Sequence, residues 1–182
     1  MEVRVVKKEE YSFIDDFVYE IFRHTNYSNG VAEKALVREI REKHFYIPEL
    51  DLVVEEEGGI IGHFILSKFP ISNKFENEIL MLSPVSVAIN KQRQGIGKYM
   101  LQEGIKLATK MGYKGIIVEG DYQYYQHFGF RTSTEFSIYA SMKNLPPSVE
   151  NLMAMELCEN GMANISGEVD YSIYNSLLHG QL

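Results

Sequence analysis

The stretch that decides the fold is Gln92-Arg93-Gln94-Gly95-Ile96-Gly97-Lys98, near the middle of a chain of 182 residues. It follows an extended apolar run at residues 78–89 and opens the clearest amphipathic helix, expected over residues 95–111. The first turn of a helix has four backbone N–H groups without intrahelical partners, and the helix dipole adds positive charge there. Glycines let a large group approach the backbone closely. The stretch therefore predicts an anion site, and the added charge of Arg93 and Lys98 suits a diphosphate.

Three phosphate-binding motifs can be compared with this stretch. A Walker A loop needs Ser or Thr after Gly-Lys, but Tyr99 follows Lys98, and Gln92 stands where the first glycine belongs. The dinucleotide fingerprint GxGxxG fails at its third glycine, where Met100 stands, and it lacks the ribose-binding acid further along. The third pattern, [Q/R]-x-x-G-x-[G/A], matches in full.

A second motif lies one expected strand later, at Glu119-Gly120-Asp121-Tyr122-Gln123-Tyr124-Tyr125-Gln126-His127-Phe128-Gly129-Phe130. Together the two motifs resemble the GNAT superfamily of N-acetyltransferases, whose glycine turn binds the diphosphate of acyl-CoA and whose short helix ends in Tyr-x-x-x-Gly-Phe. The order Gly-Asp-x-x-Tyr-Tyr-x-x-Phe-Gly-Phe is similar to that of a bacterial branch of small-molecule acetyltransferases. The resemblance covers roughly residues 51–139, with weaker agreement over residues 1–43.

The resemblance implies a role for particular residues. Tyr125 would be the general acid at the leaving sulfur, because a phenol with a pKa of about 10 is protonated at neutral pH. The strand before the glycine turn would splay from the next one, and its backbone would pair with the pantetheine arm and polarise the thioester. The coenzyme-binding residues implied in this way are Val85, Ser86, Val87, Gln92, Arg93, Gln94, Gly95, Ile96, Gly97 and Lys98.

The base that takes the proton of the amine stays open. The candidates are Glu119 at the end of one expected strand, Glu78 at the start of another, His63 within a third, or a chain of waters. Many members have Asn near the start of the second motif, where Gly120-Asp121 stands here, and Asp121 either caps the short helix or bonds the pantetheine amide. Ile89 stands where many members have Pro. The identity of the acceptor amine also stays open.

The rest of the chain predicts a mixed α/β sheet with helices on both faces. The expected strands cover residues 3–6, 51–56, 60–69, 78–89, 114–119, 130–134, 136–142 and 152–157, and the expected helices cover residues 12–23, 31–43, 95–111 and a short segment from 121. Ser12 should cap the first helix, and Pro84 should mark a bulge or an edge, because proline cannot donate to a sheet ladder. The resemblance implies a GNAT-like acyl-CoA N-acyltransferase fold with a mostly antiparallel sheet. We expect one domain over residues 1–182, with its core at about 3–157 and a tail of uncertain structure at 158–182.

Composition narrows the class of protein further. The apolar fraction of 45% and the charged fraction of 24% are ordinary for a globular chain. A net charge of −7 argues against a duplex-binding surface. The single cysteine, Cys158, excludes an internal disulfide and a cysteine-rich zinc site, and we expect no metal. Because no apolar run approaches the ~20 residues of a membrane helix and no signal-peptide core is present, we expect a cytoplasmic protein without nucleic-acid or membrane partners.

The resemblance implies an acetyl-CoA-dependent N-acetyltransferase that acetylates an amine of a small molecule or peptide by direct attack on the thioester. The alternative is a non-catalytic acyl-CoA-binding regulatory protein on the same fold. A nucleotide-phosphate binder of another fold is disfavoured by the two motifs that fail. An exposed edge among the C-terminal strands would allow a homodimer.

Overall fold

The structure is a computed structural model that describes residues 1–178. Its main sheet has seven strands, in the spatial order β1 (Glu2–Val5), β2 (Asp51–Glu56), β3 (Gly59–Lys68), β4 (Ile79–Val87), β5 (Gly115–Glu119), β8 (Leu152–Glu156) and β6 (Arg131–Thr132). Neighbouring strands are antiparallel except β4 and β5, which run parallel. A separate two-stranded parallel sheet pairs β7 (Ile138–Ala140) with β9 (Gly167–Val169).

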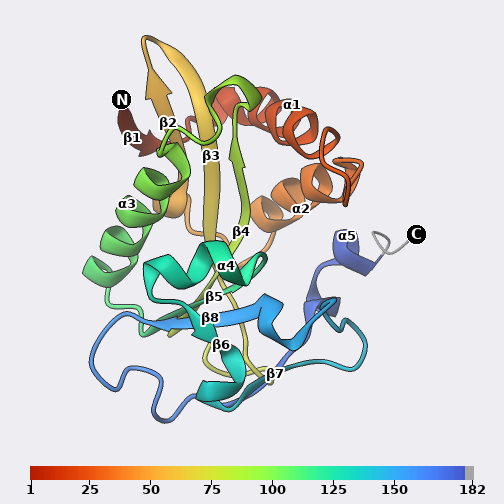
Figure 1. The fold of residues 1–182 in the computed structure, drawn as a ribbon, viewed down its shortest axis with the longest axis vertical. Helices are drawn as coiled ribbons and strands as arrows, with labels where there is room; N and C mark the ends of the chain where they lie inside the picture. Colours follow the sequence, from red (N-terminus) through yellow and green to blue (C-terminus); the bar gives the residue numbers. More distant parts are fainter. Residues whose placement is uncertain (179–182) are drawn as a thin grey trace.

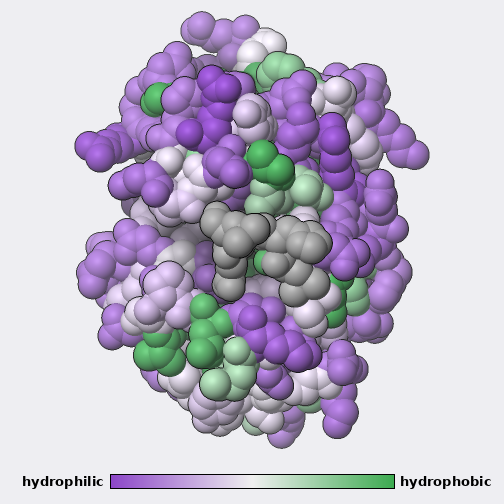
Figure 2. Space-filling model, turned by 90° about the vertical axis from the view of Figure 1, so that its right-hand side faces the viewer, coloured by the Kyte–Doolittle hydropathy of each residue, from purple (hydrophilic) through white to green (hydrophobic). Residues whose placement is uncertain are grey.

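Helices cover both faces of the main sheet (Figure 1). The helices α1 (Tyr11–Phe22) and α2 (Val31–Glu42) lie on one side, and α3 (Ile96–Lys110) lies on the other. The short helices are α4 (Tyr122–Tyr125), which leads into the 3-10 turn η4 (Gln126–Phe128), and α5 (Asn175–Leu178). Successive strand residues point to opposite faces, so Ile65 joins the buried cluster under α1 and α2 while Phe64 joins the one under α3. Polar side chains cover most of the face shown in Figure 2.

The strand β4 opens the main sheet along part of its length. On one side it pairs with β3, and the register shifts around Ser83 and Pro84, between the pairs Leu66–Leu82 and Phe64–Val85. This irregularity confirms the interruption expected at Pro84. On the other side, pairing with β5 ends at Met81–Ile117, although β4 continues to Val87. The splayed β4 and β5 that the fold class implied are therefore present.

The differences from expectation lie at the ends of elements and after residue 161. Ser12 does not cap α1, because the 3-10 turn at residues 8–10 runs directly into a helix that begins at Tyr11. The two strands expected over residues 130–142 shrink to β6 and β7, because residues 133–136 form a 3-10 turn. The sequence has weak signals after Gly161, yet Val169, Tyr171 and Tyr174 are buried in the cluster under α1 and α2.

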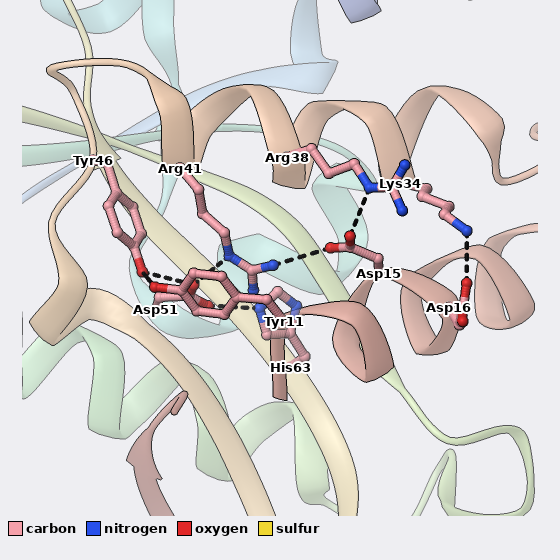
Figure 3. Close-up of polar contacts among 9 residues, drawn as sticks. All are labelled: Tyr11, Asp15, Asp16, Lys34, Arg38, Arg41, Tyr46, Asp51 and His63. Carbon is pink, nitrogen blue, oxygen red and sulfur yellow. Dashed lines mark hydrogen bonds and ion pairs between the residues drawn. The ribbon is translucent and has the colours of Figure 1, made fainter. Parts of the chain in front are cut away.

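A buried polar network joins α1 and α2 to β2 and β3 (Figure 3). The fully buried carboxylate of Asp51 accepts hydrogen bonds from Arg41 Nε at 2.8 Å, His63 Nε2 at 2.8 Å and the Tyr46 hydroxyl at 3.0 Å. Arg41 also donates to Asp15 at 3.0 Å. Although burial opposes it, these bonds from His63 and Arg41 hold the pKa of Asp51 below its usual value. Asp51 is therefore charged at neutral pH, and its charge is matched within the protein.

Replacing Asp51 tests how much the fold depends on this network. Asp51→Asn should lower the free energy of unfolding by about 3 kcal/mol in urea denaturation at pH 7, because it leaves a buried charge incompletely paired. The control is Asp16→Asn, which breaks an exposed ion pair with Lys34 and should change stability far less. Equal losses from the two substitutions would show that the buried Asp51 network stabilises the fold no more than an exposed ion pair does.

Candidate functional site

The gap between β4 and β5 exposes backbone groups of β4. The N–H of Ala88 donates to the carbonyl of Ile61, which precedes Gly62 on β3, at 2.9 Å. Because the backbone groups of a strand alternate in direction, those of Ser86 also point to β3, and those of Val85 and Val87 point into the gap. Two of the three strand residues expected to meet the coenzyme thus turn their backbone groups into the gap. The third, Ser86, is buried and donates its hydroxyl to the His63 carbonyl at 3.3 Å.

The glycine turn presents free N–H groups at the start of α3. Gly95 precedes the helix with φ at +84°, and no side chain caps the helix. The first N–H to find a backbone acceptor is that of Tyr99, which donates to the Gly95 carbonyl at 3.0 Å. Those of Ile96, Gly97 and Lys98 have no partner among residues 1–178. Three aligned donors at the positive end of the helix dipole form an anion site.

The glutamines of the turn support its shape. Gln92 donates its side-chain amide to the Val87 carbonyl at 3.1 Å, and Gln94 donates to the Asn90 carbonyl at 2.9 Å. Arg93 is exposed and has a φ of +59°. The sequence did not predict these hydrogen bonds, because a glutamine at these positions can bind either the loop backbone or a ligand, and the sequence motif is the same in both cases.

The helix α4 follows β5 and carries adjacent tyrosines. Asp121 caps it by accepting a hydrogen bond from the Gln123 N–H at 2.9 Å, so the capping reading of Asp121 is confirmed. Tyr124 places its hydroxyl against the first turn of α3, where a Cβ on Gly97 would lie 2.6 Å from it. This close approach gives a physical reason for the second glycine of the turn, which is separate from any ligand.

Tyr125 is 9% exposed, and its ring meets that of Phe130 edge-on with centroids 5.6 Å apart. Its hydroxyl makes no hydrogen bond within the described chain. Burial raises its pKa well above the usual value, and nearby Tyr124, Tyr27 and Asp121 add to the effect. The phenol is therefore protonated at neutral pH.

The three candidate bases have very different surroundings. His63 is fully buried in the Asp51 network, and burial lowers its pKa. Glu78 precedes β4 at the end where β4 and β5 still pair, and its carbonyl accepts from the Lys114 N–H at 2.8 Å. Only Glu119 lies at the end of β5 that borders the gap. Although part of it is open to solvent, burial raises the pKa of its carboxyl, while the neighbouring Tyr171 hydroxyl lowers it.

Glu119 and Tyr125 lie on opposite faces of the sheet. Ile117 belongs to the cluster under α1 and α2, and Glu119 is two residues further along β5, so it points to the same face. Tyr125 belongs to the cluster under α3. The gap therefore has a carboxylate on one face and a protonated phenol on the other.

A groove of about 470 Å³ continues from the glycine turn along α3. Its lining residues are Lys98, Gln102, Ile105 and Lys106 of α3, His127 and Phe128 of η4, and Met155 of β8. The spacing of four between Lys98, Gln102 and Lys106 places them on one helix face, and this pattern is visible in the sequence. Among the described residues, no group of three or more His, Cys, Asp or Glu could hold a metal ion. No helix in that part of the chain is long and apolar enough to cross a membrane.

Comparison with known proteins identifies the family. A family model described as an acetyltransferase (GNAT) domain matches residues 34–132, more than half of the chain, including both motifs. The chain belongs to the GNAT acetyltransferase family. The GNAT fold and family expected from the sequence are thereby confirmed.

One curated GNAT relative is the uncharacterized N-acetyltransferase YjhQ of Escherichia coli, which is 27% identical over 99 residues. The alignment covers 54% of this chain and 55% of that protein, so the chain spans about half the length of the curated relative it matches.

Solved structures share the GNAT fold over nearly the whole chain. The N-acetyltransferase YhbS of Escherichia coli, in complex with CoA, has a TM-score of 0.79 and 23% identity, and the match covers 93% of this chain and 88% of that one. A GNAT acetyltransferase of Brucella melitensis, in complex with acetyl-CoA, has a TM-score of 0.76 and 25% identity, with 97% of each chain covered.

The contact between Gly97 and Tyr124 can be tested through stability alone. Gly97→Ala should lower the melting temperature, because the new methyl group meets the Tyr124 hydroxyl at 2.6 Å. In a Tyr124→Phe background the nearest ring carbon would be 3.7 Å away. There the same change should be neutral or raise the melting temperature, since alanine favours helix by up to about 1 kcal/mol over glycine. Equal effects in both backgrounds would contradict the contact.

Proposed function

We propose that this protein is an acetyl-CoA-dependent N-acetyltransferase that acetylates an amine of a small molecule or peptide by direct attack on the thioester. The observation that carries the proposal is the convergence on one gap of the free N–H groups of α3, the β4 backbone groups that face away from β3 and the buried phenol of Tyr125. Membership of the GNAT family supports it, as does the acetyl-CoA bound to the similar Brucella melitensis protein.

The coenzyme would follow a path through three parts of the site. Its diphosphate would accept hydrogen bonds from the N–H groups at the start of α3, beside the charges of Arg93 and Lys98. Its pantetheine arm would pair with the backbone of Val85 and Val87. The groove along α3 would take the nucleotide end, since Lys98 and Lys106 line it and a phosphate is anionic.

The transfer itself would need a neutral amine and a good leaving group. The amine nitrogen bonds to the carbonyl carbon while a backbone N–H of β4 donates to the developing oxyanion. The C–S bond then breaks as the nitrogen loses a proton to solvent, and Tyr125 donates its own proton to the leaving thiolate. The phenolate is reprotonated from solvent. Burial keeps the pKa of Tyr125 above its usual value, so the phenol holds its proton at neutral pH, as a proton donor must.

Glu119 is the base that the geometry favours. A free alkylamine has a pKa near ~10.4 and arrives protonated, so a group must accept its proton before attack. Of the three candidates, Glu119 alone borders the gap, on the face opposite Tyr125. Its carboxylate would bind the ammonium group of the acceptor and then take the proton. The proposed acceptor is accordingly a cationic amine.

A homodimer remains a prediction. The strands at the two edges of the main sheet are β1 and β6. Size-exclusion chromatography with light scattering would test whether the chain pairs.

Tyr125→Phe tests the acid, because it keeps the ring and removes only the hydroxyl. We expect kcat to fall by about 10²-fold or more, with the acetyl-CoA dissociation constant unchanged within about threefold, as followed by thiol release and calorimetry. Tyr113→Phe, in the turn between α3 and β5, is the matched control and should retain full activity. Full activity of Tyr125→Phe would remove Tyr125 from the mechanism. Coenzyme binding without turnover of any amine by the unmodified protein would instead support the regulatory alternative.

Glu119→Gln tests the base through its pH dependence. The carboxyl must be ionised to accept a proton, so activity should rise with pH through a midpoint above the usual 4.5, the direction in which burial moves this pKa. The substitution should lower kcat/KM by about 10²-fold for an alkylamine and far less for an arylamine such as aniline, whose nitrogen is already neutral at pH 7. Glu78→Gln is the control. A loss of equal size for both acceptors would contradict a role for Glu119 as base.

A further inference from the structure

We propose that the end of β5 is a preformed seat for the catalytic phenol, in which Gly120 receives the ring of Tyr125 and Asn151 holds Gly120 in place. Both would be positioning residues rather than catalytic ones. The proposal rests on the proposed function, since it concerns the tyrosine that we assign as general acid.

Gly120 touches the ring of Tyr125 directly. A Cβ at Gly120 would lie 2.7, 3.4 and 3.7 Å from three ring carbons of Tyr125. The backbone of Gly120 is not in the left-handed region, so its conformation alone would admit other residues. The position therefore requires glycine because of the ring. The ring has little freedom to give way, since it also meets Tyr124 and Phe130 edge-on, with centroids 5.2 and 5.6 Å away.

Asn151 binds both backbone groups of Gly120. The Gly120 N–H donates to the Asn151 carbonyl at 2.9 Å, and the Asn151 side-chain amide donates back to the Gly120 carbonyl at 2.9 Å. These bonds continue the ladder between β5 and β8 by one residue past the pair Glu119–Leu152. One residue thus fixes the peptide groups on either side of the Gly120 Cα, through its backbone carbonyl on one side and its side-chain amide on the other.

Asn151 is itself held before any ligand binds. Its N–H donates to the Ser148 carbonyl at 3.0 Å, and its side-chain oxygen accepts from the Ser148 N–H at 2.9 Å. On the other side of the seat, the Tyr125 N–H donates to the Asp121 carbonyl at 3.1 Å, which ties the tyrosine to the residue after Gly120. Hydrogen bonds therefore hold both ends of the segment from Gly120 to Tyr125.

Such a seat would matter for catalysis more than for binding. Catalytic groups must be held within about 0.5 Å of their productive place, and an error of about 1 Å can cost about 10²-fold in rate. The phenol has no hydrogen bond to fix it within the described chain, so packing must set its position. Gly120 is part of that packing, because its lack of a side chain leaves the space that the Tyr125 ring fills. A methyl group at Gly120 would occupy that space and displace the ring.

The first experiment compares Gly120→Ala with Gly59→Ala, where a Cβ would meet its nearest atom at an ordinary 3.7 Å. We expect Gly120→Ala to lower kcat by about tenfold or more and to lower the melting temperature, because the methyl group crowds the ring, with the acetyl-CoA dissociation constant close to that of the unmodified protein. Gly59→Ala should match the unmodified protein in all three. Unchanged kcat in a folded Gly120→Ala variant would overturn the proposal.

A double-mutant cycle separates positioning of the hydroxyl from a general structural effect. In a Tyr125→Phe background, Gly120→Ala should cause less than about twofold further loss of kcat, because the group that it misplaces is already absent. The same fold-loss in both backgrounds would overturn the proposal. Full activity of Tyr125→Phe would instead refute the acid role in the proposed function, so the two failures are distinguishable.

Asn151→Ala provides a second test that leaves Gly120 unchanged and applies even if Gly120→Ala does not fold. It removes the amide that holds the Gly120 carbonyl, and we expect kcat to fall severalfold while coenzyme affinity is retained. Asn164→Ala replaces an exposed asparagine and is the matched control. If Asn151→Ala keeps the full kcat, Asn151 does not position Tyr125.

Discussion

Pairing between β4 and β5 ends at Met81–Ile117, and the rest of the site depends on that early end. Two parallel strands that diverge leave backbone donors and acceptors without a neighbour, and such groups need partners. An extended ligand with amide groups of its own can supply them, as an added strand would. The register shift between β4 and β3 at Ser83 and Pro84 comes just after the last pair between β4 and β5. The hydrogen bonding of β4 therefore becomes irregular on one side where it ends on the other.

The gap also explains why the chemical groups are distributed over two faces. Side chains of adjacent strand residues alternate across a sheet, so a closed sheet would keep a group under α1 and α2 apart from one under α3. Where β4 and β5 separate, Glu119 and Tyr125 border the same gap from opposite sides. In the proposed reaction, the amine and the leaving sulfur therefore need not compete for the same space.

Local features of this fold could be predicted from the sequence, and features formed between distant segments could not. The glycine turn, the Asp121 cap and the irregularity at Pro84 each depend on a few neighbouring residues. The backbone conformations and hydrogen bonds that these residue types allow are known. The choice among Glu119, Glu78 and His63 depends instead on strand order and burial. Ser12 failed as a cap because a 3-10 turn precedes α1, and the buried place of Tyr171 and Tyr174 has no periodic pattern to reveal it.

The Asp51 network has a consequence for how this sequence can vary. Removing one member leaves a charge in the interior without its counterpart, whereas replacing the whole set with apolar residues of similar volume is often neutral or stabilising. Drift at these positions should thus proceed by joint replacement, and homologues should carry either the complete set or none of it. An engineer seeking a more heat-resistant enzyme would begin by redesigning Asp15, Arg41, Asp51 and His63 together.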